Sequence, residues 1–375
     1  MKWIHLVLVT FCFASALQAQ KHEPGEITLL VGTYTSGKSE GIYLYDFDTT
    51  SGAAMLQQII KAEDPSYLAV AADSRHFYAV NESGKAKGFG KVTAYAVDSI
   101  AHWVSYLNRQ PSLGEHPCYL SIDNSGRWLA VSNYSSGNFS VMPINNDGSL
   151  GSRAEVVQHT GHGTDTIRQD KPHVHSAVFS PDNKYLLVAD LGLDELSVYS
   201  FDQLTGKVGR KSVTKITPGG GPRHFVFSES GRHVYALEEM SGMLNVFRYR
   251  KGKLHFKQRL SAVSSGFTGK TGAADIHRSG KFIYSSNRGD ENAIAIFSAN
   301  KKGKLRLVGH QSTLGKTPRN FVIDPSGKFL LAANQNSDEI VIFKRDIKTG
   351  LLTDSGKRIK TPNPVCLKWL QAPTL

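Results

Sequence analysis

The sequence predicts an all-β fold, a β-propeller of seven four-stranded antiparallel blades, from three features. A marker segment, in most cases a Pro followed by an alternating apolar strand, recurs at intervals of about fifty residues, the range of propeller blades. No stretch of the chain has a sustained helical period. The repeats begin with a second strand and end with a first strand, so the C-terminal strand would pair into the first blade and close the ring.

Each repeat has the same order of parts. Its marker is one of Pro65, Pro117, Pro172, Pro222, Thr271, Pro318 and Pro364. The marker strand leads to a turn rich in Asp, Asn, Ser and Gly, which suits a tight hairpin. A second apolar strand follows, as at 234–237, then a third, as at 244–247, and a more polar fourth, as at 305–308. The first repeat starts at its second strand, 28–31, and the last ends at its marker strand, 365–370.

Residues 1–19 differ from the rest of the chain. Lys2 precedes an apolar run from Trp3 to Phe13, and small residues follow up to Ala19. This order is typical of a secretory signal peptide, and the apolar run is too short to span a bilayer. We therefore expect an exported protein, periplasmic or secreted, with a single propeller domain over residues 20–375.

We expect most of the positive charge of the chain to belong to solvated turn residues, and a small anionic ligand is the alternative. The formal net charge is +12 at pH 7, from 44 Lys and Arg residues against 32 Asp and Glu residues. These cations are scattered over loops such as 301–304, and no nucleic-acid motif is present. No later apolar run could cross a bilayer. We expect a monomer that binds no nucleic acid and has no membrane span.

The cysteine content excludes a disulfide framework. Beyond residue 19 the chain has only Cys118 and Cys366, which is too few for such a framework in an exported protein. Both fall on first strands of repeats that are not neighbours. We therefore expect two free, buried thiols.

The antiparallel strand order predicts where polar groups meet. The first strand of a blade starts at one face of the disc and the second strand returns to that face, so both ends share one mouth. The residues after the markers, with the longer repeat at 172 aligned through Phe179, are Ser66, Cys118, His175, Arg223, Gly272, Arg319 and Val365. The residues at the second-strand exits are Tyr34, Glu82, Tyr134, Leu191, Glu239, Arg288 and Gln335.

Some residues at the mouth could serve only to cap turns, whereas others are of types that turns do not need. Beside the exits are Asn81, Asn133, Asp190, Glu238, Asn287 and Asn334, and Asn or Asp at such places often only caps a turn. Turns need neither an imidazole nor a guanidinium, so the catalytic candidates are His175, Arg223, Glu239 and Arg288, which fall in three consecutive repeats. The candidates for substrate binding are His173, Glu82, Tyr134, Arg319, Gln335 and Asn287.

A metal site is the alternative use of the two histidines in this set. His173 and His175 have strand spacing, which would put both imidazoles on one face. No Cys, His or Asp at ligand spacing supports them, apart from His116 and His224 elsewhere in the mouth, so we expect no bound metal.

At these residues the chain resembles the seven-bladed β-propeller lactonase family of the 6-phosphogluconolactonase type. The resemblance is carried, in chain order, by 31–37 with 39–43, 81–84, 172–175 with 190–194, 221–224 with Glu239, 286–289 and 318–321. A related fungal carboxymuconate-lactonizing enzyme uses a His, two Arg and a Glu at the channel mouth, which match His175, Arg223, Glu239 and Arg288. The family more often has Asn where this chain has Glu238, which would add a negative charge beside the site.

The resemblance implies hydrolysis of a sugar lactone, 6-phosphogluconolactone or a related aldonolactone, without a cofactor. Arg223 and Arg288 would stabilise the carbonyl oxygen or hold a phosphate or carboxylate. His175 suits a general base or acid, and Glu239 would orient it or act as the base itself. Two alternatives stay open: a periplasmic propeller that only binds a ligand or protein, and a muconate-type lactonizing cycloisomerase.

Overall fold

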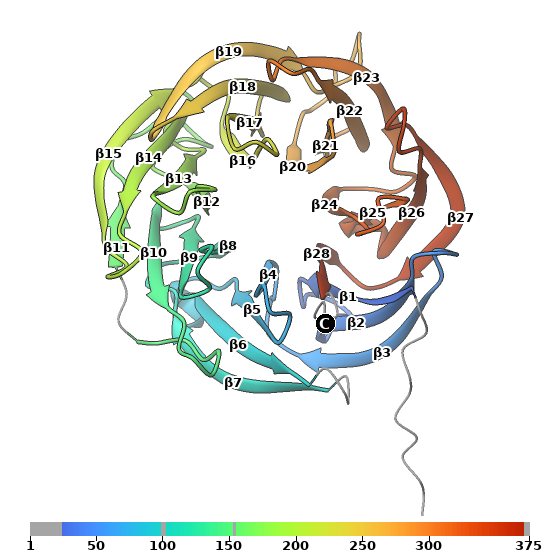
Figure 1. The fold of residues 1–375 in the computed structure, drawn as a ribbon, viewed down its shortest axis with the longest axis horizontal. Coiled ribbons are helices and arrows are strands. Elements are labelled where there is room, and N and C mark those ends of the chain that lie inside the picture. The colour runs from blue at the N-terminus through green and yellow to red at the C-terminus, as the bar shows by residue number, and fades with distance from the viewer. Residues whose placement is uncertain (1–24, 99–102, 153–154, 371–375) are drawn as a thin grey trace, which may run out of the picture.

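The computed structural model describes residues 25–98, 103–152 and 155–370. These form seven four-stranded antiparallel sheets arranged as a ring, as Figure 1 shows. The predicted fold class is confirmed. The expected signal peptide, residues 1–19, lies outside the described residues. Within them, no helix is long and apolar enough to cross a bilayer.

The blades follow one another along the chain, each running from an inner to an outer strand. Blade 1 consists of β28 (Pro364–Leu370), β1 (Glu26–Thr33), β2 (Gly41–Asp48) and β3 (Ala54–Lys61). Blade 2 consists of β4 (Leu68–Val70), β5 (His76–Asn81), β6 (Lys91–Val97) and β7 (Val104–Pro111). Blade 3 consists of β8 (Pro117–Ile122), β9 (Trp128–Asn133), β10 (Asn138–Pro143) and β11 (Glu155–Gln158).

The remaining blades have the same order. Blade 4 consists of β12 (Val174–Phe179), β13 (Tyr185–Asp190), β14 (Glu195–Phe201) and β15 (Val208–Lys215). Blade 5 consists of β16 (Pro222–Phe227), β17 (His233–Glu238), β18 (Met243–Arg250) and β19 (Lys253–Ser261). Blade 6 consists of β20 (Ala273–Ser279), β21 (Phe282–Asn287), β22 (Ala293–Ala299) and β23 (Leu305–Ser312). Blade 7 consists of β24 (Pro318–Ile323), β25 (Phe329–Asn334), β26 (Glu339–Arg345) and β27 (Leu352–Lys360). Two short 3-10 turns follow second strands, η1 (Lys85–Lys87) after β5 and η2 (Gln335–Ser337) after β25.

The ring closes through the two ends of the described chain. Strand β28 pairs antiparallel with β1, with Thr28 opposite Leu370 and Val31 opposite Leu367 (Figure 1). The last strand therefore covers the inner edge that the first blade would otherwise leave unpaired. This confirms the predicted closure of the ring.

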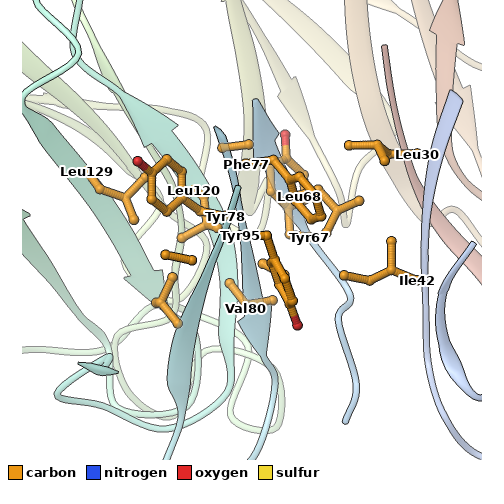
Figure 2. Close-up of a cluster of buried hydrophobic side chains, with 14 of the residues drawn as sticks. Leu30, Ile42, Tyr67, Leu68, Phe77, Tyr78, Val80, Tyr95, Leu120 and Leu129 are labelled. Carbon is orange, nitrogen blue, oxygen red and sulfur yellow. The ribbon is translucent and has the colours of Figure 1, made fainter. Parts of the chain in front are cut away.

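The hydrophobic core is divided among the contacts between neighbouring blades. Figure 2 shows one such cluster, which joins Leu30 of blade 1, Phe77 and Tyr78 of blade 2 and Leu129 of blade 3. All four side chains are fully buried, and each buried side chain of this size contributes about 1.5–3 kcal/mol from removal of apolar surface from water. The Tyr78 hydroxyl also donates to the Gly148 carbonyl oxygen of blade 3 at 3.0 Å. The packing therefore fixes each blade against the next.

Six inner strands carry a bulge at the same place, just inside the mouth of the channel. The register of pairing with the next strand shifts there in blades 1 and 3–7. The residues skipped by the register are Cys118, His175, Arg223 with His224, Ala274 with Asp275, Arg319 and Val365. A β-bulge re-aims a side chain and often lies beside a functional site. The repeated bulge thus orients side chains of the inner strands toward the centre of the ring.

The two cysteines lie as predicted. Cys118 is on β8 of blade 3 and Cys366 is on β28 of blade 1, and both are buried free thiols. Burial raises the pKa of both thiols, that of Cys366 to about 11. Both side chains are therefore protonated and weakly nucleophilic at neutral pH.

Candidate active site

A cavity of about 600 Å³ opens at the mouth where the inner strands begin and the second strands end. Its size is in the range of small-molecule sites. The lining residues are Tyr34, Glu82, Cys118, Tyr134, Arg168, His175, Glu239, Met240, Thr271, Gly272, Arg288, Gly289, Thr317 and Arg319. The position of the cavity agrees with the mouth predicted from strand order.

Glu239 is the centre of the charged cluster in this cavity. Its carboxylate contacts three guanidiniums: Arg168 Nη2 lies 2.6 Å from Oε1, and Arg223 Nε and Arg288 Nη2 lie 2.9 and 3.0 Å from Oε2. His175 Nε2 lies 4.0 Å from Oε2. The structure therefore brings together all four residues proposed for catalysis, and it adds Arg168.

The backbone around Glu239 is fixed by both neighbouring connections. The residue follows the end of β17, and its N–H donates to the Gly221 carbonyl oxygen at 2.7 Å. Its own carbonyl oxygen accepts the N–H of Ala273, the first residue of β20, at 3.1 Å. Glu239 thus lies at the junction of blades 5 and 6, where both blades contribute cations to it.

Two of the three guanidiniums are held in place by backbone carbonyl oxygens. Arg223 Nη1 donates to the Ala274 carbonyl oxygen, and Arg288 Nε donates to the Gly272 carbonyl oxygen at 2.9 Å. The side chain of Arg223 is 3% exposed and that of Arg288 is 16% exposed. These two cations are therefore fixed features of the mouth, with Arg288 at its surface and Arg223 beneath it.

The surroundings decide the charge of each group. Burial alone would raise the pKa of Glu239, but Arg288, Arg223 and Arg168 outweigh it and lower the pKa to about 2. Burial, and after it the charge of Arg223, holds the pKa of His175 well below its ordinary value. Burial lowers the pKa of Arg288 to about 10, which leaves it charged. At neutral pH the site therefore contains a carboxylate, a neutral imidazole and charged guanidiniums.

Aromatic and sulfur groups surround the His175 imidazole. The Tyr134 ring meets it edge-on at 5.4 Å, and Cys118 Sγ lies 3.7 Å from Nδ1. Deeper in the channel, the His224 ring lies 5.3 Å away and its Nδ1 contacts Asp275 Oδ1 at 2.8 Å. His175 thus forms the floor of the cavity above a packed layer of side chains.

A second polar group faces the cluster around Glu239 from blades 7, 1 and 2. Arg319 Nη2 donates to the Tyr34 hydroxyl at 2.8 Å, and that hydroxyl donates to Glu82 Oε2 at 2.9 Å. Ser66 also donates to Glu82 Oε2. Burial raises the pKa of Tyr34, so it stays a neutral donor. These groups offer hydroxyl, carboxylate and guanidinium contacts suited to a polyhydroxylated ligand.

Only some of the residues proposed for substrate binding line the cavity. Tyr134, Glu82 and Arg319 line the cavity. His173 lies behind Tyr134, stacked on its ring at 4.3 Å, with Nδ1 3.0 Å from the Tyr134 carbonyl oxygen. Gln335 begins η2 and is not part of the lining.

Asn287 has a structural role in its turn. Its side-chain oxygen accepts the N–H of Gly272 at 2.9 Å, and its amide donates to Glu291 Oε2 at 2.7 Å. It does not line the cavity. The turn-capping interpretation therefore fits Asn287 better than the substrate-binding one.

One detail of the sequence alignment needs correction. In blade 6, Ala273 pairs with Asn287 as Pro222 pairs with Glu238, so Ala274 and not Gly272 is equivalent to Arg223. The alignment of His175 through Phe179 is correct, because Val174 pairs with Asp190 in the same manner. Blade 6 thus supplies a backbone carbonyl oxygen where its neighbours supply side chains.

The expected extra charge from Glu238 does not reach the site. Its fully buried carboxylate accepts from Arg259 Nε at 3.1 Å and Nη2 at 2.7 Å, and also from Asn245 and Ser241. It does not line the cavity. Glu238 and Arg259 form a structural ion pair within blade 5, and the prediction of a second carboxylate beside the site was wrong.

Arg168 was not predicted from the sequence. This residue lies on neither a marker strand nor a second-strand exit, but in the connection 159–173 between β11 and β12. That connection is the longest among those that join an outer strand to the next inner strand. The longest interval between markers, from Pro117 to Pro172, was the signal of an insertion at the mouth.

The described residues around His173 and His175 do not form a metal site. His173 and His175 both contact Tyr134, and the bulge at His175 interrupts the two-residue alternation that would align the imidazoles. Among the described residues, no group of three or more His, Cys, Asp or Glu side chains converges as metal ligands do.

Comparison with known proteins gives the family to which this seven-bladed propeller belongs. The chain belongs to the family described as lactonase, 7-bladed beta-propeller, whose profile matches residues 28–369.

Individual relatives resemble the chain over nearly its whole length. A protein named 6-phosphogluconolactonase from Formosa agariphila is 39% identical over 333 residues, covering 86% of this chain and 94% of the relative. Another of that name, from Bacillus subtilis, is 36% identical over 346 residues, covering 91% of this chain and 97% of the relative. A solved structure named periplasmic gluconolactonase from Pseudomonas aeruginosa is 37% identical with a TM-score of 0.87, covering 93% and 100% of the two chains.

Proposed function

We propose that this chain is a lactonase that hydrolyses a sugar lactone, 6-phosphogluconolactone or a related aldonolactone, to the open acid. The observation that carries the proposal is the contact set of Glu239, where guanidiniums and a neutral imidazole converge on one carboxylate in a concave mouth. Lactone hydrolysis needs a base for water and a cation for the carbonyl oxygen, and this set supplies both.

The residues have separate roles in this reaction. His175 Nε2 accepts a proton from the attacking water, and the nearby Glu239 carboxylate favours the imidazolium that forms. Arg288, which is charged and reaches the cavity surface, stabilises the negative charge that develops on the carbonyl oxygen. As the tetrahedral intermediate collapses, the ring oxygen leaves and takes the proton back from His175. The product is a hydroxy acid, which ionises to the aldonate.

A covalent mechanism through the cavity thiol is disfavoured. Cys118 lines the cavity beside His175, but burial raises the pKa of its thiol. A thiol that stays protonated is a poor nucleophile. Direct attack by water therefore fits the charges of the site better than a thioester intermediate.

The names of the relatives support the substrate class. Two relatives are named 6-phosphogluconolactonase and a structural relative is named gluconolactonase, so an aldonolactone ring is the common element. We also propose that the chain acts after export, because residues 1–19 have the pattern of a signal peptide and that structural relative is named periplasmic. Isolation of the exported protein with Gln20 as its first residue would test the location.

The test of the proposed function is proton release by the purified protein over a panel of lactones, with muconate-type acids as a cycloisomerase control. We expect turnover of an aldonolactone above its spontaneous rate, and a loss of about 10²- to 10⁴-fold in kcat for His175→Ala. A folded wild-type protein that opens no lactone would refute the proposal. Ring closure of the acids without lactone opening would replace it with the cycloisomerase.

A further inference from the structure

Arg168 differs from the other cations of the mouth in how it is held. Its side chain is 44% exposed, against 3% for Arg223 and 16% for Arg288. It reaches Glu239 Oε1 through Nη2 alone, and the same nitrogen lies 3.5 Å from the Tyr134 hydroxyl. No backbone carbonyl oxygen among the described residues anchors its guanidinium as Ala274 and Gly272 anchor the other two. Arg168 is therefore the cation that can move.

The turn that carries Arg168 is itself well fixed. The fully buried Gln169 accepts the N–H groups of Thr164 and Asp165 at 3.1 Å and donates to the Leu191 carbonyl oxygen at 2.8 Å. Asp165 Oδ1 accepts the N–H of Arg168 at 2.9 Å. The backbone of the turn is thus fixed at the rim of the cavity, and a change of partner requires only rotation of the Arg168 side chain.

Glu239 contacts three guanidiniums, which is more positive charge than its single carboxylate requires for neutralisation. Without Arg168, its Oε2 would still contact Arg223 and Arg288, while Oε1 would become free on the cavity side. Arg168 would find an equal or better partner in a phosphate or carboxylate, since guanidinium binds both groups with two parallel hydrogen bonds. The exchange therefore replaces one charge-assisted contact with another.

From these observations we infer that Arg168 recognises an anionic group on the substrate, a phosphate or a carboxylate remote from the lactone carbonyl, and leaves Glu239 to do so. This inference rests on the proposed lactonase function. Arg168 is then the specificity residue that distinguishes an anionic aldonolactone from a neutral one.

The movement of Arg168 from Glu239 to the substrate also affects His175, the proposed general base. Glu239 shares its charge with three guanidiniums while Arg168 is bound to it, and with two after Arg168 leaves. A less neutralised carboxylate 4.0 Å from His175 Nε2 stabilises the imidazolium better. An anionic substrate should therefore raise kcat as well as lower KM relative to the neutral lactone.

The test compares three lactones on wild type, Arg168→Ala and Arg168→Lys: gluconolactone, its 6-phosphate, and glucarolactone, whose anion is a carboxylate. We expect Arg168→Ala to raise KM for the preferred anionic lactone by about tenfold or more while KM for gluconolactone changes less than about threefold. Arg168→Lys should keep part of the preference for anionic lactones, because Lys keeps the positive charge but cannot form the two parallel hydrogen bonds of a guanidinium. The matched control is Arg358→Ala, which removes a half-buried arginine paired with Asp354 on the outer strand β27.

Equal losses on neutral and anionic lactones, or no loss on either, would overturn the inference. A measurement of product binding separates it from the proposed function. Wild type should bind 6-phosphogluconate or glucarate more tightly than gluconate in calorimetry, and Arg168→Ala should lose that preference. If no lactone is opened but the preference is present and lost in Arg168→Ala, the lactonase proposal fails and the anion site stands. If lactones are opened and the preference is unchanged in Arg168→Ala, the anion site fails alone.

Discussion

Replacement of Glu239 by Gln tests whether this carboxylate holds the cations of the mouth together. Gln has the same shape but no charge, so the buried Arg223 and the half-buried Arg288 would lose their counterion. Both are also fixed by backbone carbonyl oxygens and cannot simply turn into solvent. We expect Glu239→Gln to destabilise the fold and to remove activity together.

The size of the effect follows from the pKa of the carboxyl group. The drop from its ordinary 4.5 to about 2 in the folded protein corresponds to about 3 kcal/mol of net stabilisation of the ionised form. This stabilisation is fully present above pH 4.5 and is lost as the pH falls toward 2, because the unfolded chain then binds the proton first. The free energy of unfolding should therefore fall by about 3 kcal/mol in Glu239→Gln at pH 7, and the difference should shrink below about pH 4.5.

The assay is urea unfolding followed by tryptophan fluorescence at pH 7 and pH 3.5, with lactone turnover measured on the same preparations. The adjacent Glu238→Gln is the matched control, since it breaks the buried pair with Arg259 outside the cavity. It should lose stability without a comparable loss of kcat. A Glu239→Gln protein as stable as wild type at pH 7, or a stability difference that does not shrink in acid, would refute the assigned role of the carboxylate.

Three other features of the structure predict measurable behaviour. Because the pKa of His175 is well below its ordinary value, kcat/KM corrected for spontaneous hydrolysis should stay level as the pH falls through 6.5, and an acid limb centred near 6.5 would contradict this. The buried thiols Cys118 and Cys366 should resist alkylation at pH 8 in the folded protein and react after denaturation, as peptide mass spectrometry can show. Leu367 of β28 is fully buried, so Leu367→Ala should lower the free energy of unfolding by about 2–5 kcal/mol, and a loss below about 1 kcal/mol would show that the closing strand contributes little.

The fold could be predicted because the same local sequence pattern recurs in every blade. Turn residues, alternating apolar strands and the incomplete first and last repeats are all visible in one sequence, and together they require a closed ring. The bulges at His175 and Arg319 were not predicted, because an extra residue in a strand has no composition of its own. The marker alignment nevertheless found Arg319 directly after its Pro, and the alignment through Phe179 found His175.

The candidate site was predictable only where chain order places residues at the mouth. Glu239 and Arg288 follow second strands and were found by that rule, whereas Arg168 lies in an irregular connection whose path the strand pattern does not determine. The rule also selects residues by position and not by side-chain direction. For that reason it included Asn287, which caps its own turn, and it expected Glu238 to act beside the site although its carboxylate pairs with Arg259.

The most direct measurement of the central proposal is the rate of proton release from gluconolactone and its 6-phosphate by wild type and Arg288→Ala at pH 7. Arg288 is the charged group at the cavity surface assigned to the carbonyl oxygen. The account predicts turnover above the spontaneous rate for wild type and a loss of about 10²- to 10³-fold in kcat for the variant, the usual effect of removing an oxyanion donor. Spontaneous rates with folded wild type, or equal rates for the two proteins, would contradict the assignment of the channel mouth as a lactonase active site.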